Sequence, residues 1–263
     1  MTGIVVTGMH RSGTSMVTRL INMLGADVGP ADRLLPAGPG NVTGYWERWD
    51  VMAINESLLR AYGCRWDRVD RWTASASTPV AAGRAVSRVA REMTRVECFV
   101  VKDPRFCLTL PHWREALGEP VVVVVSRNPW HVAHSLHRRD AMPVSYALAL
   151  WEYYSVSVLN LIRTMRCVYA DVTDALSQPM AFVTALHDAL INAGVRGLHL
   201  PDDDVHAFVD PRLDHSEGAS APLTRHQRRL IEMLAGAPVE SSGVLVSEIA
   251  LTTLKVGTGA IHK

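Results

Sequence analysis

Lysine is scarce in this sequence, and neither sign of charge dominates it. The 263 residues include 27 Lys and Arg against 26 Asp and Glu, a formal net charge of +1, and only Lys102, Lys255 and Lys263 are lysines. A nucleic-acid-binding protein needs a surplus of positive charge against the phosphates, so the composition argues against that class of partner. Arginines can still gather in one cleft, where their planar guanidinium groups suit the binding of anions.

Cysteines and long apolar runs are scarce as well. The four cysteines form no CxxC pair and have no metal-type spacing with histidine, which favours unpaired thiols in a reducing compartment. No run of 18 apolar residues occurs, and Arg11 interrupts the first apolar segment. We therefore expect a cytoplasmic protein with no membrane span, no signal peptide and no metal centre.

The chain does contain enough apolar sequence for a large core, since 48% of its residues are hydrophobic and 20% are charged. This composition excludes a disordered chain. Strands are predicted at residues 4–7, 98–102, 121–126 and 167–170, with a further short one at 26–28. Helices are predicted at residues 13–24, 50–62, 129–139, 144–165 and 181–193. The alternation predicts an α/β fold, a three-layer sandwich in which helices flank a central parallel β-sheet.

We expect one domain that spans residues 1–263. The stretch from 65 to 95 is rich in arginine and alanine and reads as helical in its second half. It lies between two predicted strands, so we expect a helical insertion or lid around residues 50–96. Acidic residues, proline and glycine punctuate the chain after residue 200, which predicts an irregular C-terminal segment around 200–263.

The strongest local motif is the loop Gly8-Met9-His10-Arg11-Ser12-Gly13-Thr14-Ser15, between the first predicted strand and the first predicted helix. In such a loop the backbone N–H groups point inward, and the helix N-terminus adds about half a positive charge. Thr14 and Ser15 supply hydroxyls, and Gly13 lets the backbone approach a ligand closely. The motif predicts an anion-binding loop; an ordinary glycine-containing turn is the alternative.

This loop departs from the pattern of ATP- and GTP-binding P-loops. The spacing from Gly8 to Gly13 fits that pattern, but Thr14 stands where a lysine is required, and the basic residue comes earlier, at Arg11. The strand at 121–126 continues into Arg127, with no aspartate to hold magnesium. These departures favour a phosphate held by arginine, hydroxyls and backbone without a metal ion.

Two segments resemble a known family. Arg11-Ser12-Gly13-Thr14-Ser15 resembles the 5′-phosphosulfate-binding loop of sulfotransferases that use 3′-phosphoadenosine-5′-phosphosulfate (PAPS). The valine-rich strand at 121–125, followed by Ser126-Arg127-Asn128-Pro129 and then Ser135, is similar to the family's 3′-phosphate motif. The resemblance implies a P-loop NTPase-like sulfotransferase fold, PAPS as the sulfuryl donor and 3′,5′-bisphosphoadenosine (PAP) as the product, without metal.

The resemblance also assigns residues to the nucleotide. It covers most of residues 1–175 at the level of motifs and is looser beyond them. Tyr169 resembles a family tyrosine that lies near the adenine. Arg212, in Asp210-Pro211-Arg212-Leu213, either reaches the nucleotide or lies on the surface. The residues expected to bind the nucleotide are Arg11, Ser12, Gly13, Thr14, Ser15, Arg127, Ser135, Tyr169 and Arg212.

Sulfuryl transfer needs a base for the acceptor hydroxyl and positive charge on the leaving oxygen. In the cytosolic branch of the family a histidine two residues after a strand-end lysine is the base, but here that position, after Lys102, is Pro104. Glu47 lies where carbohydrate-type and several bacterial sulfotransferases carry a glutamate base, and flanking indoles can desolvate it. We expect Glu47 to be the base, with Asp103 and His10 as alternatives.

Lys102 and Arg11 are then expected to stabilise the transferring group, with Arg105 in support. Aromatic residues gather near Glu47, at Tyr45, Trp46, Trp49, Trp66 and Trp72. They suit an apolar or sugar-bearing acceptor, or else they cover the inserted segment's own small core. The residues expected to contact the acceptor are Tyr45, Trp46, Trp49, Asp103 and Arg105.

The sequence thus predicts a PAPS-dependent sulfotransferase that acts on a hydroxyl of a small molecule, such as a sugar, a lipid or a secondary metabolite. A P-loop nucleotide kinase and a non-catalytic adenine-nucleotide-binding protein on the same fold are the alternatives. The sequence leaves a homodimer open.

Overall fold

A computed structural model describes residues 2–38, 41, 43–73, 78–201, 205–209, 223–239 and 243–257. Its centre is a parallel sheet of four strands in the order β2-β1-β3-β4. The strands are β1 (Thr2–Thr7), β2 (Cys98–Lys102), β3 (Val121–Ser126) and β4 (Cys167–Asp171). All three neighbouring pairs are parallel, so the carboxyl ends of the strands meet at one edge of the sheet.

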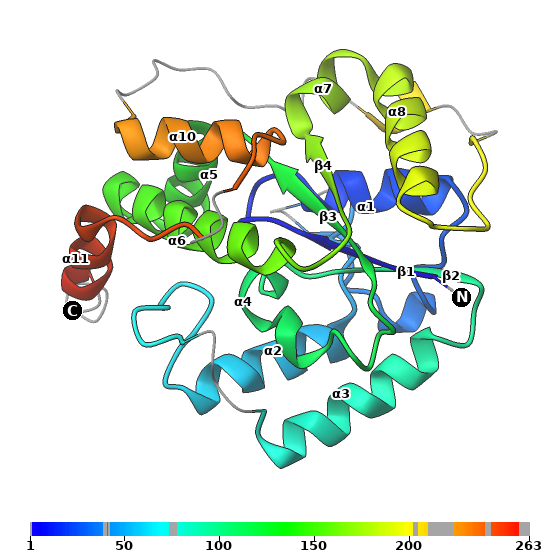
Figure 1. Ribbon diagram of the computed structural model, residues 1–263, viewed down its shortest axis with the longest axis horizontal. Helices are drawn as coiled ribbons and strands as arrows, with labels where there is room; N and C mark the ends of the chain where they lie inside the picture. The colour runs from blue at the N-terminus through cyan, green and yellow to red at the C-terminus, as the bar shows by residue number, and fades with distance from the viewer. Residues whose placement is uncertain are drawn as a thin grey trace.

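The strands bury both faces, and each face has its own core. On β3, Val121, Val123 and Val125 belong to one core, whereas Val122 and Val124 belong to the other. The first face is covered by α1 (Thr14–Met23) and α8 (Pro179–Asn192), and the second by α2 (Trp49–Ala61), α3 (Val80–Met93), α5 (Pro129–Asp140) and α6 (Val144–Ile162). Figure 1 shows these helices on either side of the sheet. The predicted α/β three-layer sandwich is confirmed.

Helices also occur beyond residue 200, in the segment predicted as irregular. They are α9 (Val205–Phe208), α10 (Arg225–Leu234) and α11 (Glu248–Gly257). Leu230 of α10 and Leu254 of α11 are fully buried in the core beside α6. The remaining short elements are η1 (Ala31–Arg33), α4 (Phe106–Thr109), η2 (Leu110–His112) and α7 (Val172–Ser177).

The short strand predicted at residues 26–28 is wrong. Only Asp27 pairs with the sheet, as an isolated parallel bridge to Phe99. Its N–H donates to the Cys98 carbonyl at 3.0 Å, and its carbonyl accepts from Val100 at 2.8 Å. Gly25 and Gly29, with φ of 103° and 89°, turn the backbone on either side of this bridge, which leaves no room for a longer strand.

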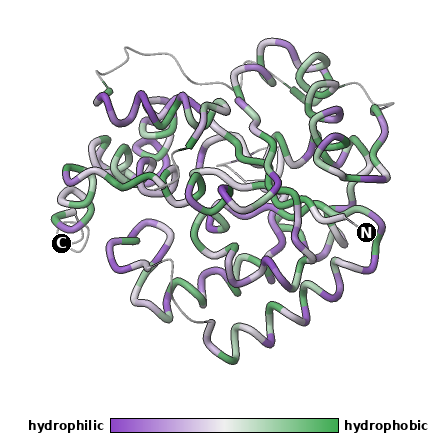
Figure 2. Tube along the Cα trace, viewed as in Figure 1, coloured by the Kyte–Doolittle hydropathy of each residue, from purple (hydrophilic) through white to green (hydrophobic). Residues whose placement is uncertain are grey.

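The region around residues 50–96 supplies a helical layer against the sheet. Val51 and Leu58 of α2 are fully buried, and α3 buries Val86 and Val89 against the same core. Figure 2 shows α3 alternating between hydrophobic and hydrophilic residues along its length, as expected of a helix with one buried face. That this region acts as a lid, within one domain of 263 residues, stays a prediction. No helix within the described ranges has the length and apolarity to span a bilayer.

Candidate active site

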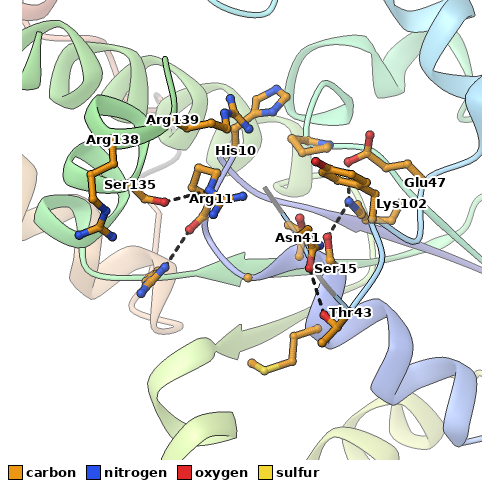
Figure 3. A pocket seen from close by; sticks show the side chains of 16 residues that line it. His10, Arg11, Ser15, Asn41, Thr43, Glu47, Lys102, Ser135, Arg138 and Arg139 are labelled. Atoms are coloured by element: carbon orange, nitrogen blue, oxygen red, sulfur yellow. Dashed lines mark hydrogen bonds and ion pairs between the residues drawn. The ribbon is translucent and has the colours of Figure 1, made fainter. Parts of the chain in front are cut away.

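A cavity of about 510 Å³ lies at the carboxyl edge of the sheet, where ligands of parallel α/β sheets bind. The loop after β1, the end of β2 and the residue after β3 all reach it. Ten residues that the sequence singled out for the site line this cavity together, as Figure 3 illustrates. They are His10, Arg11, Gly13, Thr14, Ser15, Tyr45, Glu47, Lys102, Arg127 and Ser135.

The loop after β1 has a backbone shape that depends on its glycines. Gly13 has a φ of 87°, and a Cβ built on it would lie 2.4 Å from Cγ2 of Val172. Arg11 also has a positive φ, of 71°, and the Ser12 N–H closes a turn onto the Met9 carbonyl at 3.1 Å. The chain then enters α1 at Thr14, so the N–H groups of the first helical turn face the same cavity as the loop.

Arg11 joins the two predicted phosphate motifs. Its Nε donates to Oγ of Ser135 on α5 at 2.9 Å, and Nη1 of Arg127 donates to the Arg11 carbonyl at 3.3 Å. Residues 116 and 124 positions apart in the chain are therefore held together at one end of the cavity. The two arginines lie close enough to contact one ligand.

Glu47 and Lys102 form a buried ion pair at the other end of the cavity. Nζ of Lys102 lies 2.5 Å from Oε1 of Glu47 and donates to Oγ of Ser15 at 3.1 Å. The Lys102 side chain is 1% exposed. Glu47 precedes α2 on an irregular segment, which the buried ion pair between Arg48 and Asp50 anchors at 2.7 Å. A carboxylate, an ammonium and a hydroxyl thus converge beside the phosphate-type loop.

The cavity concentrates positive charge and holds a neutral histidine. Burial, followed by the nearby charges of Arg139 and Arg127, lowers the pKa of Arg11. Burial is also the main reason that the pKa of His10 lies well below its ordinary value, with Arg105 and Arg139 as further causes. His10 is therefore uncharged at neutral pH. Its Nε2 is buried without a hydrogen-bond partner among the described residues.

Asp103 and Arg105 lie behind the cavity and do not line it. Oδ2 of Asp103 accepts from Asn55 at 3.0 Å, and Oδ1 accepts from the backbone N–H of Arg105 at 2.8 Å. Arg105 also contacts Glu56 through Nε at 2.6 Å. Asp103 is fully buried, because its hydrogen-bond partners lie in the interior, on α2 and in the turn after β2. Its observed contacts are those of a residue that fixes the strand end carrying Lys102.

Of the predicted aromatic residues, only Tyr45 lines the cavity. Trp46 lies against the guanidinium of Arg19 at 5.0 Å, and Trp49, which is 45% exposed, lies against Arg33 at 5.2 Å. Both indoles pair with arginines outside the cavity. Trp72 is buried in the core, whereas Trp66 packs on the His10 ring with a centroid separation of 4.4 Å.

Two of the residues expected to bind the nucleotide, Ser12 and Tyr169, are not among the residues that line the cavity. Ser12 is a buried residue of the loop itself. Tyr169 lines a second cavity of about 270 Å³ with Arg163 and Gly236. On β4 its side chain points toward the face covered by α6, because side chains alternate between the two faces of a strand. Arg212 lies outside the described residues.

Sequence reasoning missed Asn41, Thr43, Arg138 and Arg139, all of which line the cavity. Oγ1 of Thr43 donates to Oδ1 of Asn41 at 3.0 Å, in a loop whose path the sequence pattern does not predict. Arg138 and Arg139 follow Ser135 by three and four residues. That spacing puts them on the Ser135 side of the helix, a signal that was present in the sequence. Within the described ranges, no group of three metal-type ligands occurs.

The comparisons with known proteins agree with this architecture. No protein-family model matches the sequence, and no curated protein matches it. The fold is similar to that of the sulfotransferase domain of the Synechococcus PCC 7002 olefin synthase, at 20% identity and a TM-score of 0.50, over 89% of this chain and 94% of that one. It is also similar to the sulfotransferase domain from the curacin biosynthetic pathway, at 15% identity and a TM-score of 0.51, over 89% and 98%. The chain therefore has a sulfotransferase-type fold, as expected from its motifs.

Proposed function

We propose that this protein is a PAPS-dependent sulfotransferase that acts on a hydroxyl group of a small-molecule acceptor. The proposal depends above all on the meeting of two anion-binding motifs at one cavity, with Arg127 on the Arg11 carbonyl and Arg11 on Ser135. A nucleotide phosphorylated at both the 5′ and 3′ positions matches such a pair of sites. The sulfotransferase-type fold supports the same conclusion.

The residues present suit this nucleotide. The loop N–H groups, Thr14 and Ser15 supply donors for the 5′ end without a P-loop lysine. Arg127 and Ser135 supply a guanidinium and a hydroxyl for a 3′-phosphate. PAPS would supply the sulfuryl group, with the bond from sulfur to the 5′-phosphate oxygen breaking as the acceptor oxygen bonds to sulfur.

Glu47 would accept the proton that the acceptor hydroxyl loses. Lys102, 2.5 Å from Glu47 and 3.1 Å from Ser15, would stabilise negative charge that develops on the leaving oxygen. Its ion pair also orients the carboxylate of Glu47. Arg11 would add positive charge from the side of the loop. No catalytic step is assigned to Asp103, because it is held in the buried network behind the cavity.

Calorimetric titration with PAP, adenosine 5′-phosphate and ATP with magnesium tests the donor assignment. We expect the wild-type protein to bind PAP at least about 100-fold more tightly than adenosine 5′-phosphate, because each charge-assisted hydrogen bond to the 3′-phosphate contributes about 1.5–3 kcal/mol. The substitution Arg127→Ala should remove most of that preference. Arg84→Ala, on the exposed side of α3, is the matched control and should keep it.

Binding of ATP with magnesium but not of PAP would contradict the proposal and favour a nucleotide kinase. Binding of PAP without transfer from PAPS to any member of a broad hydroxyl-acceptor panel would favour the non-catalytic alternative.

A further inference from the structure

Arg139 is one of two cations of the cavity, with Arg138, that the proposed nucleotide contacts leave unused. It lines the cavity from the last turn of α5, next to Arg138. In Figure 3 Arg138 lies beside Ser135, at the end proposed for the 3′-phosphate, whereas Arg139 lies beside His10. Arg138 and Arg139 thus serve different parts of one cavity.

Two neighbours hold Arg139 in place. Its guanidinium lies 5.3 Å from the ring centroid of Trp66, within the range of a cation–π contact. Its Nε and Nη2 contact the carboxylate of Asp140 at 2.9 Å and 2.7 Å. A guanidinium carries five N–H donors, so this pairing leaves donors for a second anion.

The Trp66 ring that Arg139 contacts belongs to a cluster of uncharged rings, of which His10 lines the cavity. Trp66 packs against the His10 ring at 4.4 Å, and Tyr154 meets the same ring at 5.9 Å. His10 stays neutral at this position because burial and the surrounding arginines lower its pKa. Arg139 is therefore a charged group that rests on uncharged rings, with Arg11 and Arg105 as further cations near His10. A guanidinium on an apolar, aromatic surface is a good partner for a carboxylate that is attached to an apolar body.

We propose that Arg139, held on Trp66, binds a carboxylate of the acceptor, so that the preferred acceptors are hydroxy acids. This inference rests on the proposed function, since it takes the nucleotide to occupy the loop after β1, Arg127 and Ser135 in the same cavity. A monoanion fits better than a phosphate dianion, because Asp140 already offsets part of the charge of Arg139. The carboxylate end would be fixed here, with the hydroxyl left to reach Glu47.

The test uses the full chain saturated with PAP and two pairs of probes. Calorimetry compares 4-hydroxybenzoate with 4-hydroxybenzamide, and 3-hydroxyoctanoate with its amide, at up to about 10 mM. In the wild type we expect the carboxylate member of at least one pair to bind about 10-fold or more tightly than its amide. Arg139→Gln should abolish this preference, and Trp66→Leu should reduce it several-fold. Arg138→Gln is the matched control. It should weaken the binding of PAP but keep the preference for the carboxylate over the amide.

Equal binding of carboxylate and amide, failure of every carboxylate to bind, or a preference that survives in Arg139→Gln would each overturn the inference. The PAP titration that precedes these measurements reports on the proposed function separately. A protein that binds PAP but shows no preference for the carboxylate would therefore contradict only the role proposed for Arg139.

Discussion

At the scale of single residues, the ion pair between Glu47 and Lys102 joins the base to the group that stabilises charge. Both side chains are nearly buried, at 11% and 1% exposure. Removing one member of such a pair strands a charge in the interior, so the informative substitution must keep a hydrogen-bond acceptor for Lys102. Glutamine does so without the ability to take a proton.

We predict that Glu47→Gln keeps PAP affinity near that of the wild type but slows turnover about 10²–10⁴-fold, the usual contribution of a general base. Sulfate-ester formation from labelled PAPS, with an acceptor selected on the wild type, measures the rate. Circular dichroism verifies that the variant folds. An unchanged rate would move the role of base to His10, the sequence alternative that lines the cavity.

His10 gives the protein a predicted dependence of stability on pH. Its pKa is lowered in the folded state, mainly by burial and then by Arg105 and Arg139, so below its ordinary value of about 6.5 the unfolded chain binds the proton more readily. The free energy of unfolding should therefore fall as the pH drops below about 6.5, with up to about 1.4 kcal/mol per pH unit from this residue. At higher pH this contribution is constant.

Urea unfolding at pH 5.5 to 7.5 measures that slope. His10→Asn removes the titrating ring. The unfolding free energy of this variant should therefore change less steeply with pH, by an amount that corresponds to at most one proton. Identical slopes in the variant and the wild type would mean that His10 titrates alike in the folded and unfolded states.

At the scale of elements, the sequence pattern predicted the strands well where the strand has two buried faces. The run at 121–126 matches β3, and the run at 98–102 matches β2, because a continuous apolar run is typical of a parallel strand that is buried on both faces. The predicted ends of one helix also lie within one residue of the observed ends, since residues 50–62 were predicted and α2 spans Trp49–Ala61. The stretch at 26–28 failed because two flanking glycines limit pairing to a single residue.

The site was predictable only where backbone motifs fix it. Arg11 and Arg127 follow strand ends, and parallel topology brings strand ends together, so their meeting could be predicted without coordinates. Which tryptophans face the cavity could not be predicted, since Trp46 pairs with Arg19 of α1 and Trp49 pairs with Arg33 of η1. Asp103 sits next to Lys102 in the chain yet turns toward Asn55, a contact across 48 residues.

A substitution at Gly13 tests whether the loop before α1 requires a glycine at this position. A Cβ at this position meets Val172 at 2.4 Å, and the φ of 87° is strained for any other residue. We predict that Gly13→Ala costs about 2–3 kcal/mol in the free energy of unfolding and weakens PAP. Adding Val172→Ala removes the clash but not the backbone strain, so the double variant should regain only part of the loss. Urea unfolding measures both variants, and a Gly13→Ala protein as stable as the wild type would contradict the assigned geometry.

At the scale of the whole molecule, charge is balanced overall but not locally. The net charge is +1, whereas Arg11, Lys102, Arg127, Arg138 and Arg139 line one cavity with Glu47 as its carboxylate among the lining residues. A nearly neutral protein exerts little long-range attraction on an anionic nucleotide. The attraction is therefore concentrated at the carboxyl edge of the sheet, where partial burial protects it from screening by salt.

The C-terminal helices are tied to the rest of the molecule through α6. Oε1 of Glu152, which is 1% exposed, accepts from the Ser247 N–H at 2.7 Å, and Asn160 exchanges two hydrogen bonds with Val244 at 2.7 Å and 2.8 Å. Leu230 and Leu254 belong to the same core as the sheet. These contacts argue that α10 and α11 unfold together with the sheet and not before it.

We predict one cooperative transition for the chain, which would support the single-domain expectation. All seven tryptophans precede residue 200, so their fluorescence in urea follows the sheet, while hydrogen exchange at Leu230 and Leu254 follows the C-terminal helices. Both should give the same free energy of unfolding. Glu152→Ala should lower both by about 2–3 kcal/mol, because it leaves the Ser247 N–H without its buried acceptor. If exchange in α10 and α11 responded alone while the fluorescence transition stayed in place, the C-terminal helices would form a separate, weaker unit.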